Sequence, residues 1–327
     1  MGPRERIARV KHGLGRLRPA VAVGQMAHRR ALGPARRRYR ELGLRKPWFG
    51  SVSHAEVAGR GAGQARLDRA GGIDELEADE RFAALDPKLQ AGLREWPRRG
   101  YVAAEGFFAP GAVAALNAEI DRLVSGGEIH QHHLSPRFMN VHRRSPAARA
   151  LAEDPRVLEM IELILGRRAG LFQTICFIQG SQQEAHSDAF HMMTEPPGFL
   201  VGVWMALEDI DEGCGPVFYL PGSHRLPYVM TEDLGLGHPS RLVIADKGAA
   251  YVNRMRAVVG DHDAQPLTFT AKAGDVLFWH HNLTHGGSAV TRPGATRRSL
   301  VGHYFGDRVL CYHEVTERAA RMPAGFD

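Results

Sequence analysis

The sequence predicts an α+β fold, in which a mainly β barrel of the jelly-roll or a related type is flanked by helices. From about residue 170 onward, short runs of β-branched and aromatic residues are bounded by Gly, Pro and Asp, which is the pattern of strands separated by turns. The helical patterns precede these runs and do not alternate with them, which argues against a doubly wound parallel sheet. The expected strands are LFQTICFI (171–178), FLVGVWMAL (199–207), PVFYL (216–220), LTFTA (267–271), DVLFW (275–279) and SLVGHYF (299–305).

The helices can be placed from their apolar spacing and from the residues at their ends. Pro110 and Pro155 stand where a first helical turn favours proline, and Asp154 is suited to cap the second of these helices. Gly126 and Gly166 are expected to end them. The expected helices are 73–85, 87–96, 110–125 and about 154–165, after a Gly-rich linker that begins at residue 51.

The basic charge of the chain is concentrated at its N-terminus. Residues 1–48 contain twelve Arg and two Lys but only two Glu, and because the whole chain carries +6, the remainder carries −6. We expect residues 1–50 to form a basic extension that is disordered at least in part, and residues 1–48 to be dispensable for the chemistry of the site. The alternative is a patch for nucleic acid or an anionic membrane, but Tyr39 and Trp48 are the only aromatic residues there, which disfavours nucleic acid. Residues 51–97 would form a linker and helical segment, and residues 98–327 the barrel domain.

The composition excludes several classes of protein. No run of 18 apolar residues exists, so no transmembrane helix is expected, and the N-terminus lacks the apolar core of a signal peptide. Cys176, Cys214 and Cys311 are odd in number and lack metal-ligand spacing, which favours a reducing compartment. We therefore expect a cytoplasmic protein that acts on a small molecule, with no nucleic-acid partner; the oligomeric state is left open.

The most informative residues are His186, Asp188 and His285. The first two, in EAHSDAFH, stand two positions apart, so on an extended strand their side chains project from the same face. His285, in FWHHNLTHGGS, would complete the set. Two imidazoles and one carboxylate leave other metal positions open, which is the ligand set of non-haem Fe(II) oxygenases. Arg297 follows twelve residues later and could bind an anion beside the metal.

Five blocks in order surround these residues and carry a family resemblance. They are RRGYVAAEGFFAPGAVAALNAEIDRL (98–123), AEDPRVLEMIELILG (152–166), LFQTICFIQGSQQEAHSD (171–188), GFLVGVWMALEDIDEGCGPVFYLPGSHR (198–225) and AGDVLFWHHNLTHGGSAVTRPGATRRSLVGHYF (273–305). In combination they resemble the phytanoyl-CoA dioxygenase family of Fe(II)/2-oxoglutarate-dependent oxygenases. The resemblance covers roughly 98–310, and its last block is the most specific.

The resemblance implies a double-stranded β-helix fold of the jelly-roll or cupin-like type, with the metal at one mouth. His186, Asp188 and His285 would ligate Fe(2+), and Arg297 would bind the 5-carboxylate of the co-substrate 2-oxoglutarate. Arg298 remains the alternative anchor, because the interval from His285 is one residue longer than usual. Dioxygen is the second substrate, and ascorbate is a candidate reductant.

Two further residues are assigned through the same resemblance, and His191 is assigned from the number of metal ligands. Trp204 matches a pocket aromatic, although plain core packing would also explain it. Ser288 would bond the same carboxylate as Arg297. His191 would contact the substrate or a ligand rather than the metal, because the three ligands are already complete and oxygenase chemistry needs open metal positions. The insertion at 226–266 is expected to act as a lid.

The implied activity is hydroxylation of an unactivated carbon of a small molecule: a natural product, a sugar, an amino-acid derivative or an acyl thioester. The carboxylate of Asp188 supports hydroxylation, because halogenating relatives lack it. The alternative is a cupin-like metal-binding protein with non-oxidative or no catalytic activity. Arg297 discriminates between them, because a non-oxidative site has no need of a dicarboxylate anchor.

Overall fold

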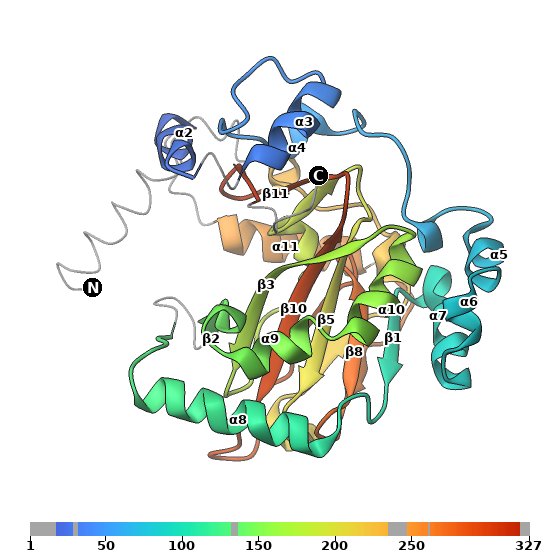
Figure 1. Cartoon of the computed structure of the whole chain (residues 1–327), viewed down its shortest axis with the longest axis vertical. Coiled ribbons are helices and arrows are strands. Elements are labelled where there is room, and N and C mark those ends of the chain that lie inside the picture. The colour runs from blue at the N-terminus through green and yellow to red at the C-terminus, as the bar shows by residue number, and fades with distance from the viewer. Residues whose placement is uncertain (1–17, 29–31, 132–136, 235–246, 261, 321–327) are drawn as a thin grey trace.

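Two antiparallel sheets form the barrel in a computed structural model that describes residues 18–28, 32–131, 137–234, 247–260 and 262–320 (Figure 1). The larger sheet has six strands and the smaller sheet has three. The smaller sheet is extended at β9 by an isolated antiparallel bridge between His285 and His186, in the loop after β3. The order in the larger sheet is β1 (Tyr101–Ala104), β8 (Val276–His280), β5 (Leu200–Ala206), β10 (Ser299–Gly306), β3 (Ala169–Phe177) and β2 (Arg137–Met139). The order in the smaller sheet is β7 (Leu267–Phe269), β6 (Val217–Tyr219) and β9 (His285–Gly287). All six expected runs contain a strand, so the mainly β prediction is confirmed.

Helices cover the outer face of the larger sheet, which buries both faces of its central strands (Figure 1). Along β5, Val201, Val203 and Met205 pack in the core beneath the helices, while Trp204 packs in the core between the sheets. This two-sided burial explains why FLVGVWMAL is a continuous apolar run rather than an alternating one. The covering helices are α8 (Pro110–Ser125), α9 (Pro146–Ala152) and α10 (Pro155–Leu165).

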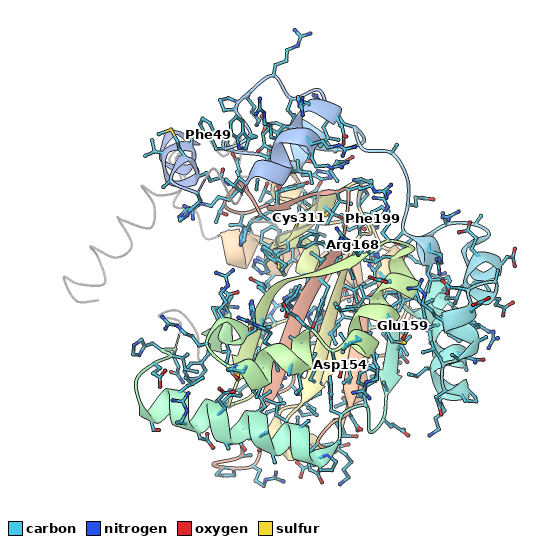
Figure 2. The ribbon with its side chains drawn as sticks, in the orientation of Figure 1. Phe49, Asp154, Glu159, Arg168, Phe199 and Cys311 are labelled. Atoms are coloured by element: carbon cyan, nitrogen blue, oxygen red, sulfur yellow. The ribbon has the colours of Figure 1, made fainter. Side chains whose placement is uncertain are left out.

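The helix ends follow the expected chemistry, with one difference. Asp154, labelled in Figure 2, caps α10 by accepting a hydrogen bond of 2.8 Å from the backbone N–H of Arg156, and Gly166 ends this helix with φ of 68°. The expected helix 73–85 is instead two helices, α5 (Gly72–Glu77) and α6 (Glu80–Ala83). Asp79 separates them, because its carboxylate caps α6 rather than continuing the first helix. The helix α7 (Pro87–Arg99) follows.

Residues 32–50 of the N-terminal extension belong to the folded body, so the partial disorder expected for residues 1–50 does not include this part. Leu32, Ala35 and Tyr39 are buried in one apolar cluster with Leu310 and Tyr312. The elements involved are α3 (Gly33–Glu41) and α4 (His54–Val57), together with a third sheet of β12 (Arg318–Ala319), β11 (Leu310–His313) and β4 (Met193–Glu195). The preceding helix α2 (Arg18–Met26) contacts this sheet through Gln25, whose side-chain amide donates to the carbonyl of Ala319 at 3.2 Å. This packing was not predicted, because the few apolar residues that pack against β11 lie among many arginines.

Truncating this cluster should destabilise the whole domain. We expect Leu32→Ala to lower the free energy of unfolding by about 2–5 kcal/mol, because the leucine is 1% exposed and its removal leaves a cavity. Urea unfolding followed by far-UV circular dichroism measures the change. Val23→Ala, at a side chain that is 65% exposed, is the matched control. Equal stability of Leu32→Ala and wild type would show that the extension is not part of the cooperative unit.

Candidate active site

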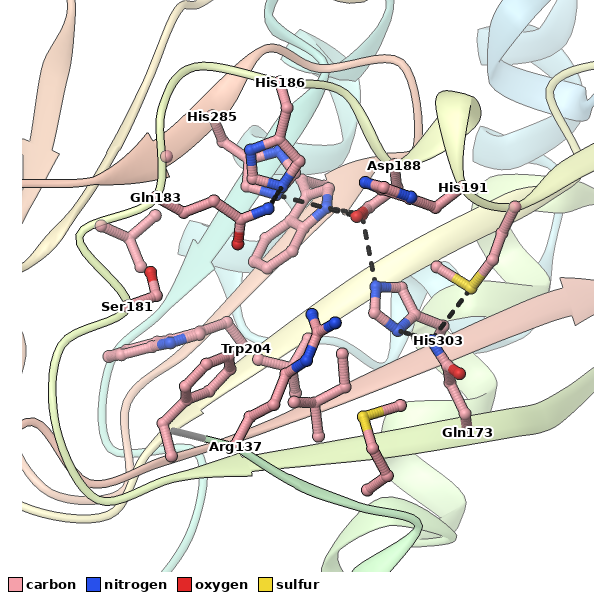
Figure 3. Close-up of a pocket in the computed structure, with 18 of the residues that line it drawn as sticks. Arg137, Gln173, Ser181, Gln183, His186, Asp188, His191, Trp204, His285 and His303 are labelled. Carbon is pink, nitrogen blue, oxygen red and sulfur yellow. Dashed lines mark hydrogen bonds and ion pairs between the residues drawn. The ribbon is translucent and has the colours of Figure 1, made fainter. Parts of the chain in front are cut away.

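The structure brings His186, Asp188 and His285 together beside one cavity (Figure 3). One ligand atom from each lies within 4.8 Å of the others, and all three side chains are buried. The two histidines are also joined through their backbones: the N–H of His186 donates to the carbonyl of His285 at 2.9 Å, and the reverse bond is 2.8 Å. This pair of bonds fixes the loop after β3 against β9. The ligand atoms are therefore positioned before any metal arrives.

Both histidines are held in the tautomer that suits metal binding. The Nδ1 atom of His186 lies 2.9 Å from the carbonyl oxygen of Glu184, and Nδ1 of His285 lies 2.9 Å from that of Leu283. A carbonyl oxygen only accepts, so each Nδ1 carries the hydrogen and each Nε2 keeps a lone pair. The Nε2 of His186 lies 3.2 Å from the amide Nε2 of Gln183, which donates to it and would have to yield to a metal. Burial, followed by the proximity of His285, lowers the pKa of His186 to about 3, so this imidazole is neutral at neutral pH.

The carboxylate of Asp188 is oriented by a tryptophan and a histidine. Its Oδ2 atom accepts a hydrogen bond of 2.8 Å from the indole Nε1–H of Trp279 and lies 3.4 Å from Nε2 of His303. Its Oδ1 atom lies 3.9 Å from Nε2 of His285. Burial alone would raise the pKa of Asp188, but the surrounding imidazoles, His303 first, hold it well below the usual range. The group is an anion with one oxygen engaged and the other directed toward the histidines.

The position of Trp279 depends on a glycine in the neighbouring strand. Gly202 of β5 pairs with Trp279 of β8, and a Cβ atom at residue 202 would lie 2.3 Å from the indole Nε1. The glycine in the run FLVGVWMAL therefore makes room for the ring that holds Asp188.

Gly202→Ala should displace the indole and weaken metal binding. We expect Fe(II) affinity to fall at least about tenfold, as is usual when a partner of a metal ligand is lost. Isothermal titration under anaerobic conditions gives the affinity, and Gly111→Ala, with no atom within 4 Å of its added Cβ, is the control. Trp279→Phe removes the same N–H without crowding the strand and should weaken binding as well. Unchanged affinity in both variants would contradict this role of the indole.

Arg297 is a buried cation without a counter-ion. Its side chain is 2% exposed, its Nε has no hydrogen-bond partner, and no carboxylate of the described residues pairs with it. The guanidinium carbon lies 5.4 Å from the ring centroid of Phe177 and 6.0 Å from that of Trp204. Burial lowers the pKa of Arg297 to about 10, so it remains charged at neutral pH. A buried charge is costly unless it is paired, so this arrangement suits a bound anion.

Arg298 has a different environment. Its guanidinium pairs with Asp121 at 2.7 Å, and its backbone N–H donates to Glu208. Adjacent residues of an extended segment point to opposite faces, so only Arg297 reaches the cavity. The geometry thus favours Arg297 over Arg298 as the anchor.

Trp204 and Ser288 differ in how they relate to the cavity. Trp204 is 1% exposed, lines the cavity, and has an indole Nε1 without a hydrogen-bond partner. Ser288 does not line the cavity, and its backbone N–H bonds to Pro216. The extra glycine after His285 places Ser288 on the opposite face of the strand. The hydroxyl in the cavity is instead that of Ser181.

The cavity beside the three candidate ligands has a volume of about 300 Å³ and contains polar residues that sequence reasoning missed. Arg137, on β2, points its guanidinium into this space (Figure 3). Burial lowers its pKa, and its Nε has no hydrogen-bond partner among the described residues. Gln173 lies 3.3 Å from Nδ1 of His303, its cross-strand neighbour. His191, which is already expected from the sequence to lie beside the substrate or a ligand, also lines the cavity, and burial lowers its pKa to about 4. The three-residue strand that holds Arg137 is too short to give a periodic signal.

A double-stranded β-helix with a His-x-Asp and distant His cluster, beside a buried unpaired arginine, defines an Fe(II)- and 2-oxoglutarate-dependent dioxygenase. The family model described as phytanoyl-CoA dioxygenase (PhyH) matches residues 96–299. The chain belongs to the phytanoyl-CoA dioxygenase family.

Individual relatives agree with this assignment. The ectoine dioxygenase of Bordetella parapertussis is 25% identical over 233 residues, which cover 62% of this chain and 70% of that protein. Among solved structures, the non-haem α-ketoglutarate-dependent epimerase SnoN from nogalamycin biosynthesis superposes with a TM-score of 0.53 at 22% identity, covering 69% of this chain and 86% of that one. EctD from S. alaskensis, crystallised with bound Fe, gives 0.52 at 20% identity, covering 65% and 75%. These structures share the fold of the barrel.

Proposed function

We propose that His186, Asp188 and His285 ligate one Fe(II) and that Arg297 binds the far carboxylate of 2-oxoglutarate. The buried, unpaired guanidinium in the same cavity as the three ligands carries this proposal. Together, iron, 2-oxoglutarate and dioxygen supply an oxidant able to remove hydrogen from an unactivated carbon, with succinate and carbon dioxide as co-products. The retained carboxylate of Asp188 supports hydroxylation as the outcome.

The side chains of the protein prepare this chemistry by position and charge. The Nδ1–H bonds of the two histidines hold each Nε2 toward the ligand cluster, and Trp279 holds one oxygen of Asp188 away from it. Phe177 and Trp204 pack beside the guanidinium of Arg297, so that a carboxylate bound there would meet little competing water. The remaining cavity wall fixes which carbon of the substrate faces the iron.

A test that needs no substrate is uncoupled turnover. The purified protein should bind one Fe(II) per chain and release succinate slowly from 2-oxoglutarate and dioxygen, with ascorbate as reductant. Succinate formation that persists without iron, or iron bound at another stoichiometry, would argue against the assignment.

We further propose that the substrate to be hydroxylated is a small polar molecule with an acidic group, and that Arg137 binds this group. Arg297 accounts for one carboxylate of 2-oxoglutarate and the iron for its other end, which leaves the second unpaired cation of the cavity for the substrate. A volume of about 300 Å³ lies at the low end of small-molecule sites, which favours a small substrate or one that extends out of the mouth.

Arg137→Gln should separate the two anion sites. We expect the KM for 2-oxoglutarate in uncoupled turnover to change by less than about threefold, because Arg137 is assigned to the substrate. If Arg137 bound 2-oxoglutarate instead, losing this charged contact would raise that KM about tenfold or more. Turnover triggered by a panel of small carboxylates should fall in this variant. A KM for 2-oxoglutarate raised as far as in Arg297→Gln would place Arg137 on the co-substrate instead.

We also propose a cellular compartment and the bounds of the catalytic domain. Cys176, Cys214 and Cys311 are all buried free thiols, which supports action in the reducing cytoplasm (Figure 2 labels Cys311). No described helix has the length and apolar character needed to cross a bilayer. We infer that residues 98–327 contain the catalytic domain and that residues 32–50 stabilise it.

A further inference from the structure

Helix α11 (Lys247–Gly260), from the insertion expected to be a lid, contacts the segment that carries His186 and Asp188. Ser187 stands between these two residues, and its backbone N–H donates to the hydroxyl of Tyr251 at 2.8 Å. The same hydroxyl lies 3.3 Å from the carbonyl oxygen of Ser187 and can donate to it. One phenol thus serves both backbone groups of the residue between two metal ligands.

With the bonds to Tyr251, the backbone of each of the residues 186–188 is hydrogen-bonded. The backbone of His186 is bonded to His285, and the carbonyl of Asp188 accepts from the N–H groups of His191 and Met192, at 2.8 Å each. The N–H and carbonyl of Ser187 point away from β9, toward the open edge of this extended segment. No described strand pairs with that edge. Tyr251 supplies the partner that a neighbouring strand would otherwise provide.

Apolar packing holds the tyrosine in place. Its ring stacks on Phe190 at a centroid distance of 3.8 Å and an interplanar angle of 15°, and both residues are buried with Val229 and Met255. Tyr251 is 3% exposed, so its hydroxyl cannot exchange this bond for water without moving the helix. The ion pair of Arg256 with Glu184, at 3.2 Å, adds a contact that is exposed on both sides and contributes little.

We propose that Tyr251 is a positioning residue for the metal: through Ser187 it sets the spacing of His186 and Asp188, so that docking of α11 and metal binding are coupled. The proposal rests on the proposed ligand set. It assigns the described part of the insertion a role in building the metal site, in addition to any role in covering the substrate.

Tyr251→Phe tests the coupling, because it keeps the stacked ring and removes the hydroxyl. We expect the Fe(II) dissociation constant, measured anaerobically, to rise about tenfold, the usual minimum for loss of a group that orients a metal ligand. The absorption spectrum of the Co(II)-loaded variant should also shift, since it reports ligand geometry. Tyr39→Phe is the matched control, because it removes a buried hydroxyl bonded to the Gly50 carbonyl at 3.0 Å on another helix. Arg256→Gln should change the affinity by less than about twofold.

A second measurement uses the wild-type protein alone. Coupling is reciprocal, so bound metal must stabilise the docked helix. Amide hydrogen exchange in residues 251–258 should slow when Fe(II) is added, and should respond less in Tyr251→Phe. Tight Fe(II) binding by wild type with unchanged affinity and spectrum in Tyr251→Phe would overturn the coupling alone. Failure of wild type to bind Fe(II) would overturn the ligand assignment and the coupling with it.

Discussion

Asp188→Ala should abolish Fe(II) binding and 2-oxoglutarate turnover. The substitution removes the only carboxylate of the cluster and leaves the N–H of Trp279 without its acceptor in a buried site. We expect at least a hundredfold loss of Fe(II) affinity, more than the loss of a partner outside the ligand set would cause. Anaerobic titration and succinate formation measure the two effects.

The control for this experiment is Asp209→Ala. Asp209 is an exposed aspartate paired with Lys272 and lies away from the cavity, so its removal should leave both measurements unchanged. Iron-dependent succinate formation at a wild-type rate in Asp188→Ala would show that another group completes the ligand set.

The second large effect is expected at Arg297. Arg297→Gln should raise the KM for 2-oxoglutarate roughly a hundredfold, which corresponds to about 2.7 kcal/mol and lies in the range for one lost partner of a buried charge pair. Iron binding should change far less, because the guanidinium is not a ligand. Initial rates of succinate formation across a range of 2-oxoglutarate concentrations give the KM.

Arg298→Gln is the matched control for the anchor. It removes an arginine at the adjacent position whose side chain pairs with Asp121, so the KM for 2-oxoglutarate should stay within about threefold of wild type, as expected for a surface ion pair. The opposite ranking of the two variants would mean that the anion enters from the side of Arg298.

The parts of the fold that depend on local pattern could be predicted from sequence. The strand that contains Trp204 is buried on both faces and reads as a continuous apolar run, the strand that contains Val301 is rich in β-branched and aromatic residues, and Asp154 is a local cap. His186 and Asp188 stand together because their spacing is local, and the structure adds His285 through backbone bonding between distant segments.

What could not be predicted depends on contacts between distant segments. The family resemblance predicts Ser288 in the site, but Ser288 does not line the cavity, because one inserted glycine reverses the face of an extended residue. Arg137 lies on a three-residue strand and Tyr251 on a helix. Neither local sequence predicts that the side chain reaches the site. The packing of residues 32–50 could not be predicted because charge dominates their composition, while a few apolar side chains determine how they pack.

The bridge between His186 and His285 has a consequence for how the protein survives in the cell. It joins segments about a hundred residues apart, so the proposed ligand set exists only once the chain has closed a long loop, and an unfolded chain would offer no comparable site. Metal that binds only the native state stabilises it by RT ln(1 + [metal]/Kd), about 2.7 kcal/mol at a hundredfold excess over Kd. Iron supply would then set the cellular half-life of this enzyme as well as its rate, with the iron-free form the first to be unfolded and degraded when iron is scarce.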